Sequence, residues 1–253
     1  MSKTTGEILF ESYLASIELA DRFDYEPAIG RKAPDYLVHG VQDVLCEIED
    51  FGEGDLDRKI AEILVGEARG GAYEPHLRVR EKIEAAGRQL REFKNRFPTL
   101  IVLHNPGFFV DLNEIIIAGA MYGNLQFVVE IGADPDAARE AETRFDRKKA
   151  KLRPQQNTSI SAVAVLENIK PNYRLVVELL EQHAAESRAK GVDVVESAVE
   201  AWHMIEKLRP EVDLDLTIPR LRIFHNAYSV LPLDAKVFQG PHDKHFYPDP
   251  RDR

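Results

Sequence analysis

Residues 34–51, with the sequence PDYLVHGVQDVLCEIEDF, decide the fold expected for this chain. Two mainly apolar runs, 34–38 and 44–51, flank a short segment at 39–42 that contains a glycine. Apolar runs of this length on either side of a glycine-containing turn are typical of a β-hairpin. The sequence therefore predicts two neighbouring antiparallel strands in a largely buried sheet.

Three acidic side chains lie in this hairpin. Because side chains two residues apart on a strand share a face, Glu47 and Glu49 point the same way as Leu45. The turn brings Asp35 close to Glu47. Carboxylates on otherwise buried strands are costly unless a cation or a partner offsets their charge, and Mg²⁺ or Mn²⁺ prefers oxygen ligands. The sequence therefore predicts a divalent-metal site on the hairpin.

The hairpin belongs to an ordered series of expected elements. They are a helix at 7–20, strands at 22–27, 34–38 and 44–51, a helix at 78–96 and a strand at 99–107. This order, with Pro-Asp at 34–35 and Glu-x-Glu at 47–49, resembles the PD-(D/E)XK, or restriction-endonuclease-like, nuclease superfamily. The resemblance covers roughly residues 7–132. It implies an α/β fold with a central mixed sheet flanked by helices, followed by a C-terminal α/β extension.

The resemblance also implies roles for individual residues. In the superfamily a helical Glu, the Asp of the PD pair and the Glu of the E-x-K triplet hold the metal, and a Gln on the next helix often supports the site. The matching positions are Glu11, Asp35, Glu47 and Gln89, with the backbone carbonyl of Ile48 as a further metal ligand. Two alternatives stay open for the helical acid: Glu11 is also explained by a favourable interaction with the helix dipole, and Glu26 on the preceding strand is a rival ligand.

One position departs from the family pattern. Where the superfamily usually has the lysine of E-x-K, this chain has Glu49. The lysine would orient or deprotonate the attacking water and offset charge in the transition state. A few nucleases of the superfamily resemble this chain in carrying a second Glu there. Alternatively, Lys82 supplies the missing ammonium, because it lies two helical turns before Gln89 on nearly the same face; an ordinary surface lysine is the simpler explanation.

Composition sets the wider frame. The 253 residues, 44% apolar and 30% charged, are enough for one domain with a sizeable core, which we expect to span 1–253 with a nuclease-like part at about 7–132 and an extension at about 133–253. Cys46 is the only cysteine, which excludes an intramolecular disulfide and fits a reducing compartment. No signal-peptide pattern or membrane-length apolar run is present, so we expect a cytoplasmic protein.

The charge distribution bears on partners. A net charge of −10 argues against a surface that coats nucleic acid broadly. The segment 144–153 nevertheless holds six basic residues and one acid. The basic residues, which either form a solvated surface or guide a phosphate backbone toward the metal, are Arg144, Arg147, Lys148, Lys149, Lys151 and Arg153. The sequence is compatible with a homo-oligomer and gives no reason to expect a membrane partner.

The remaining segments predict further regular structure. Expected elements are a helix at 113–123, a strand at 125–132 that extends the same sheet, a buried strand within 157–168, helices at 173–190 and 193–208, and a strand at 220–233. Four prolines follow Leu231, and they predict an irregular surface tail. His242 and His245 in that tail have H-x-x-H spacing, but no further close ligand completes a zinc site, so we expect them to be exposed.

Two functions of different classes fit these observations. The first is a metal-dependent phosphodiesterase that cleaves DNA or RNA and uses Mg²⁺ or Mn²⁺. The second is a catalytically degenerate nuclease fold that serves as a binding or scaffold module. Asp35, Glu47 and Gln89 together favour the first function, whereas Glu49 and the acidic surface favour the second.

Overall fold

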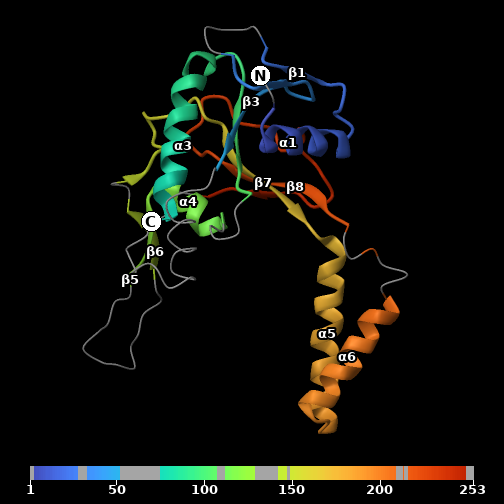
Figure 1. Ribbon diagram of the computed structural model, residues 1–253. Helices are drawn as coiled ribbons and strands as arrows, with labels where there is room; N and C mark the ends of the chain where they lie inside the picture. Colours follow the sequence, from blue (N-terminus) through green and yellow to red (C-terminus); the bar gives the residue numbers. More distant parts are fainter. Residues whose placement is uncertain are drawn as a thin grey trace, which may run out of the picture. The chain divides into compact units, whose positions relative to one another are not determined.

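The computed structural model describes residues 3–27, 33–51, 75–106, 112–128, 142–146, 149–208, 213 and 216–248 (Figure 1). The chain divides into two compact units. One unit comprises residues 1–167 and 221–253, and the other comprises residues 168–220. The first unit contains the mixed sheet and the predicted site residues, and the second is built around two helices.

The first unit is organised around a seven-stranded sheet in the order β1-β2-β3-β4-β7-β8-β9. Its strands are β1 (Phe23–Tyr25), β2 (Tyr36–Val38), β3 (Val44–Asp50), β4 (Thr99–His104), β7 (Ala162–Ile169), β8 (Ile218–His225) and β9 (Lys244–Phe246). Strands β1 to β3 form an antiparallel meander, whereas β4 is parallel to both β3 and β7. The expected α/β class, with a mixed sheet flanked by helices, is confirmed.

The predicted hairpin is present, with Leu37 paired to Leu45 in the antiparallel β2–β3 register. The chain then crosses over to β4, which is parallel to β3, through α3 (Pro75–Leu90) and the short 3-10 turn η1 (Arg91–Phe93). All six residues of β4 are buried. A continuous apolar run of this kind is expected of a central strand covered on both faces.

Helices cover both faces of the sheet (Figure 1). On one face, Phe10 and Leu14 of α1 (Thr5–Ser16) pack in the same apolar cluster as Cys46 of β3. On the other face, Ile83 of α3 packs with Leu45 of β3, together with residues of α4 (Glu114–Tyr122). The alternation of side chains along β3 therefore sends odd-numbered residues toward α3 and even-numbered residues toward α1.

The second unit contains α5 (Pro171–Lys190) and α6 (Val194–Leu208), which lie side by side (Figure 1). Pro171 occupies the first turn of α5, where its missing N–H costs no hydrogen bond. Gly191 ends the helix with φ of 69°, a left-handed conformation that glycine adopts readily. Both helices were expected from apolar periodicity. None of the helices in the described ranges is long and apolar enough to cross a membrane.

The strand expected at 125–132 has a different partner from the one predicted. Strand β5 (Asn124–Val128) pairs with β6 (Glu142–Asp146) in a separate two-stranded sheet, so the prediction that it extends the main sheet is wrong. Both edges of β4 are already occupied, by β3 and by β7. Residues 129–132 lie outside the described part of the chain.

The C-terminal tail is more ordered than its prolines suggested. Residues Lys244–Phe246 form β9, which lies parallel to β8, and the Phe246 ring stacks on Phe224 with centroids 4.6 Å apart. His245 is half-buried, and its Nδ1 lies 2.9 Å from Nε2 of His225. The expectation of an irregular tail with exposed histidines is therefore wrong for this segment, because its three residues contain no proline and can pair.

Candidate active site

The three carboxylates of the hairpin lie on the α3 face of the sheet. Continuing the β2–β3 register by one residue beyond Tyr36 places Asp35 opposite Glu47. By strand alternation Glu47 and Glu49 point the same way as Leu45, which packs against α3. Glu47 is only 8% exposed. The predicted proximity of Asp35 and Glu47 therefore follows from the observed pairing.

Each carboxylate has a defined hydrogen-bond partner. Oδ2 of Asp35 accepts a hydrogen bond from the backbone N–H of Ile48 at 2.7 Å. The Gln89 side-chain amide donates to Oε2 of Glu47 at 2.7 Å and to the carbonyl of Ala33 at 3.2 Å. Helix α3 thus fixes the orientation of Glu47 and ties it to the chain just before Asp35.

Lys82, which the sequence offered as a substitute for the missing lysine of E-x-K, also reaches the hairpin carboxylates. Its Nζ lies 2.8 Å from Oε2 of Glu49, in a partly buried ion pair. Lys82 and Gln89 are seven residues apart on α3, and a separation of two turns puts them on the same side of the helix. The five residues predicted to carry the chemistry, namely Asp35, Glu47, Glu49, Lys82 and Gln89, are therefore brought together.

Burial and mutual repulsion shift both central carboxyl groups toward their protonated forms. Burial raises the pKa of Glu47 to about 8, and the charges of Asp35 and Glu49 raise it further, against the opposing hydrogen bond from Gln89. Burial also raises the pKa of Asp35 to about 6, although the hydrogen bond from Ile48 opposes the shift. The two neighbouring carboxyl groups therefore retain a proton to a higher pH than isolated carboxyl groups would. A bound cation would replace that proton.

The structure adds an acid that the sequence reasoning missed. Glu7 is buried near the start of α1, where its carboxylate accepts hydrogen bonds from the backbone N–H of Thr4 at 2.5 Å and from the Tyr25 hydroxyl at 3.2 Å. Its charge contributes to the raised pKa of Asp35. The signal available in the sequence was Thr-x-x-Glu at 4–7, which is a capping-box pattern.

The helical acid predicted as a metal ligand, Glu11, lies one turn further along α1. Its Oε1 accepts hydrogen bonds from Lys3 at 2.5 Å and from the Tyr36 hydroxyl at 3.0 Å. The rival Glu26 lies just after β1, with its backbone N–H bonded to the Asp35 carbonyl at 2.7 Å, and its charge also raises the pKa of Asp35. Both acids are thus near the hairpin, and the charge of Glu26, like those of Glu7 and Glu49, raises the pKa of Asp35.

His104, which ends β4, interacts with the other face of the sheet. Its Nδ1 lies 2.6 Å from Oδ1 of Asp50, and Oδ2 of Asp50 accepts the backbone N–H of Gly6. Burial raises the pKa of Asp50, but hydrogen bonds from Thr4, His104 and Gly6 outweigh burial and lower it. This pair anchors the start of α1 and does not face Glu47 and Glu49.

Only part of the basic segment is described. Residues 147 and 148 lie outside the described ranges, whereas Lys151 forms an ion pair with Glu84 of α3 at 2.6 Å. Glu84 is two residues from Lys82, which corresponds to about 200° around a helix. Lys151 therefore contacts the opposite side of α3 from the carboxylates.

The donor chemistry of the hairpin suits a hard divalent cation, because carboxylate and carbonyl oxygens are its usual ligands. Within the residues that the structure describes, however, no group of three or more His, Cys, Asp or Glu side chains is arranged to hold a metal ion. Asp35, Glu47 and the backbone carbonyl of Ile48 are the ligands that the sequence predicted. A comparison of the chain with protein-family models, curated proteins and solved structures found no match.

Proposed function

We propose that this protein is a metal-dependent phosphodiesterase that cleaves nucleic acid, built on a restriction-endonuclease-like core. The observation that carries the proposal is the 2.8 Å contact between the Lys82 ammonium and Glu49. Strand β3 has no lysine after Glu47, and α3 delivers one to the same place. A positioned ammonium of this kind orients an attacking water and offsets negative charge on the transition state.

The arrangement of elements supports the same proposal. A helix, three antiparallel strands, a crossover helix and a strand parallel to the third follow one another in α1, β1 to β3, α3 and β4. This is the element order on which the resemblance to the superfamily rests. It places the acids of the hairpin under the helix that carries Lys82 and Gln89.

Asp35, Glu47 and the Ile48 carbonyl would hold Mg²⁺ or Mn²⁺, and the ion would lower the pKa of a water and polarise the scissile phosphate. The residues of the chain have separable tasks. Glu47, once deprotonated, would be one of the ligands, and the hydrogen bond from Gln89 would keep its carboxylate oriented. The hydrogen bond from Ile48 holds Asp35 in place. Lys82 would hydrogen-bond the attacking water and offset the negative charge that develops on the phosphoryl oxygens.

A specific observation favours a second function, that of a binding or scaffold module. The hairpin acids are already satisfied by partners within the protein, and the described residues contain no metal-ready group of three acidic, histidine or cysteine side chains. A nuclease fold that has lost its metal would have such internally compensated carboxylates. Metal binding separates this function from catalysis.

The decisive experiment combines calorimetry with cleavage assays. Wild type is titrated with Mn²⁺ and assayed with Mg²⁺ and Mn²⁺ on single- and double-stranded DNA and RNA. We expect Asp35→Asn to abolish metal binding and cleavage, and Lys82→Gln to lower the cleavage rate about 100-fold while leaving metal affinity nearly unchanged. Lys190→Gln on α5 removes the same charge far along the chain and should behave like wild type.

A charge exchange tests the role of Lys82 more sharply. Glu49→Lys alone places two ammonium groups together, so we expect cleavage to fall about 100-fold despite the restored E-x-K pattern. The double variant Glu49→Lys/Lys82→Glu keeps the ion pair with its charges exchanged and should recover most of the activity. If wild type neither binds Mn²⁺ nor cleaves any substrate, the scaffold function is the better account.

A further inference from the structure

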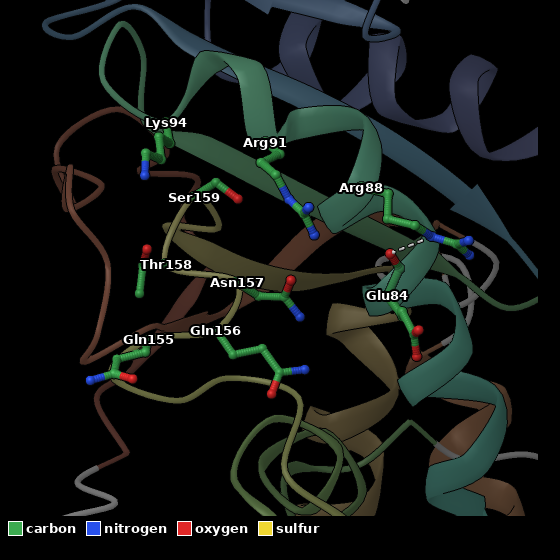
Figure 2. Close-up of a pocket in the computed structure, with 9 residues that line it drawn as sticks. All are labelled: Glu84, Arg88, Arg91, Lys94, Gln155, Gln156, Asn157, Thr158 and Ser159. Carbon is green, nitrogen blue, oxygen red and sulfur yellow. Dashed lines mark hydrogen bonds between the residues drawn. The ribbon is translucent and has the colours of Figure 1, made fainter.

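A cavity with a volume of about 390 Å³ lies on the flank of α3 turned away from the carboxylates. One wall is formed by the end of α3 and the turn after it, which present Arg88, Arg91 and Lys94. The opposite wall is the loop at 155–159, which leads toward β7. Figure 2 shows Arg91 and Lys94 extending from the helical side toward this loop. The volume lies within the ~300–1,000 Å³ range of small-molecule sites.

Helical geometry separates this cavity from the proposed active site. Glu84, Arg88 and Arg91 follow one another at spacings of four and three residues and therefore form one stripe. Lys82 is about 200° around the helix from Glu84, and Gln89 lies on the Lys82 side. The two sets of side chains cannot serve the same bound group.

The cavity is positively charged in a protein that carries a net charge of −10. Glu84 is the single acid among its lining residues, and the ammonium of Lys151 neutralises it at 2.6 Å. The charges of Arg88, Arg91 and Lys94 remain. Three cations around one cavity repel one another, and an anion placed among them would relieve that repulsion.

Stabilisation of the end of α3 explains the presence of Arg88 in the cavity wall, but it does not explain Arg91 and Lys94. Arg88 Nε donates to the carbonyl of Glu84 at 3.4 Å, so Arg88 interacts favourably with the negative end of the helix dipole (Figure 2). Within the described ranges, the side chains of Arg91 and Lys94 make no hydrogen bond or ion pair. Both are exposed to the cavity and to solvent.

The loop wall supplies neutral donors. In the part of the chain that the structure describes, the hydroxyls of Thr158 and Ser159 and the side-chain amides of Gln155 and Gln156 have no hydrogen-bond partner. All four side chains line the cavity. Hydroxyl and amide donors combined with an arginine fork are the usual partners of phosphate oxygens.

The loop is held in one conformation by its own hydrogen bonds. Arg153 and Gln156 exchange backbone hydrogen bonds at 3.1 Å, and the Asn157 amide donates to the carbonyl of Lys151 at 2.9 Å. Asn157 has a φ of 55°, in the left-handed region that asparagine tolerates better than most residues. The donors are therefore positioned before a ligand arrives, which lowers the entropic cost of binding.

We propose that this cavity binds a phosphate group, with Arg91 and Lys94 as its charged ligands and the 155–159 loop as its neutral donors. The phosphate comes either from a small phosphorylated molecule or from the backbone of a nucleic-acid strand. The proposal does not rest on the proposed nuclease activity, because it concerns a different flank of α3 and needs no metal.

The test measures binding in the presence of EDTA, so that metal-dependent cleavage plays no part. Inorganic phosphate and adenosine monophosphate are titrated by calorimetry, and a short single-stranded DNA with or without a 5′ phosphate is titrated by fluorescence anisotropy. We expect Arg91→Gln/Lys94→Gln to weaken binding by at least about tenfold, since each lost charged hydrogen bond costs about that factor. Arg188→Gln/Lys190→Gln, on exposed α5 positions, makes the same charge change and should leave binding unchanged.

The two sources of phosphate give different results. Binding of the small probes without the DNA assigns the cavity to a small phosphorylated molecule. Binding of the DNA that weakens in the cavity variant, with a shallower salt dependence, assigns it to a strand. The proposal is overturned if wild type binds none of the probes, or if the cavity variant and its charge-matched control lose equal affinity.

Discussion

Glu47 is the residue at which burial of a carboxyl group makes folding depend on pH. Its pKa is raised from the ordinary value of 4.5 to about 8 by burial and by neighbouring carboxylates. The folded state therefore binds more protons than the unfolded state between these values. The stabilisation that this proton provides is complete below about pH 4.5 and is lost as the pH rises through about 8. A divalent cation offers a second way to neutralise the same group.

Replacing Glu47 with glutamine should remove this pH dependence. We expect Glu47→Gln to match wild type at about pH 5 and to be more stable by roughly 4 kcal/mol at about pH 9, because only wild type must then bury a charge. Urea denaturation at the two pH values measures the difference. Glu181→Gln, on the exposed surface of α5, should follow the wild-type profile. An equal difference at both pH values would show that ionisation of Glu47 is not its cause.

The alternation of side chains along a strand was sufficient to place some residues of the candidate site but not others. The odd-numbered residues of β3 had to share a face, so the grouping of Glu47 with Glu49 followed from local geometry alone. The burial of Glu7 depends on Tyr25 and on the way α1 crosses the sheet, which no local pattern encodes. The ion pair between Lys82 and Glu49 depends on how α3 packs against the sheet, so the spacing of residues along α3 alone could not determine it.

At the scale of elements, the start of α1 joins helix capping to the candidate site. The Thr4 hydroxyl accepts the backbone N–H of Glu7, and the Glu7 carboxylate accepts the backbone N–H of Thr4. This reciprocal capping box fixes the Glu7 carboxylate, which also receives the Tyr25 hydroxyl. Loss of the cap should therefore affect both helix stability and the environment of Asp35.

We expect Thr4→Ala to lower the free energy of unfolding by about 1 kcal/mol, the usual cost of losing such a cap. Thr4→Ser keeps the hydroxyl and should lose much less. Chemical denaturation compares the three proteins, and the pKa of Asp35, followed by carbon NMR, reports whether Glu7 has moved. A Thr4→Ala variant as stable as wild type would mean that water replaces the cap at no cost.

Elements with strong local signals were predicted well. Local sequence is sufficient to identify β4, because it is a buried apolar run. It is also sufficient for α5, because a proline and a glycine mark its two ends. The pairing of β5 and the existence of β9 depended on which strand edges remained free. Edge availability is a property of the assembled sheet, so a strand pattern alone could not determine it.

At the scale of the whole chain, the sheet collects strands from distant parts of the sequence. Strands β7, β8 and β9 lie beyond the expected nuclease-like part at 7–132, yet they belong to the same sheet as the hairpin. The class of the fold was implied by the resemblance that the order of the expected strands and helices carries. The full strand order was not, because the connections from β4 to β7 and from β7 to β8 are long and carry no turn signal that fixes their direction.

Asp243 joins the C-terminal tail to the first helix and to the sheet. Its carboxylate accepts the Tyr13 hydroxyl at 2.6 Å, the backbone N–H of Leu221 at 2.8 Å and the backbone N–H of Gly240 at 2.6 Å. Burial and this negative charge raise the pKa of the Tyr13 phenol, so the phenol stays a hydrogen-bond donor. One side chain thus links elements more than 200 positions apart in the sequence.

Asp243→Ala should therefore destabilise the protein by about 3 kcal/mol, since it leaves several polar groups without an acceptor. Tyr13→Phe alone removes one of these hydrogen bonds and should cost about 1 kcal/mol. In the double variant the buried phenol no longer needs a partner, so the combined loss should be smaller than the sum of the single losses. Chemical denaturation of the four proteins measures this coupling, with the exposed Asp21→Ala as the control. Additive losses would mean that the tail is held by β9 pairing alone, whereas a positive coupling assigns the attachment to Asp243.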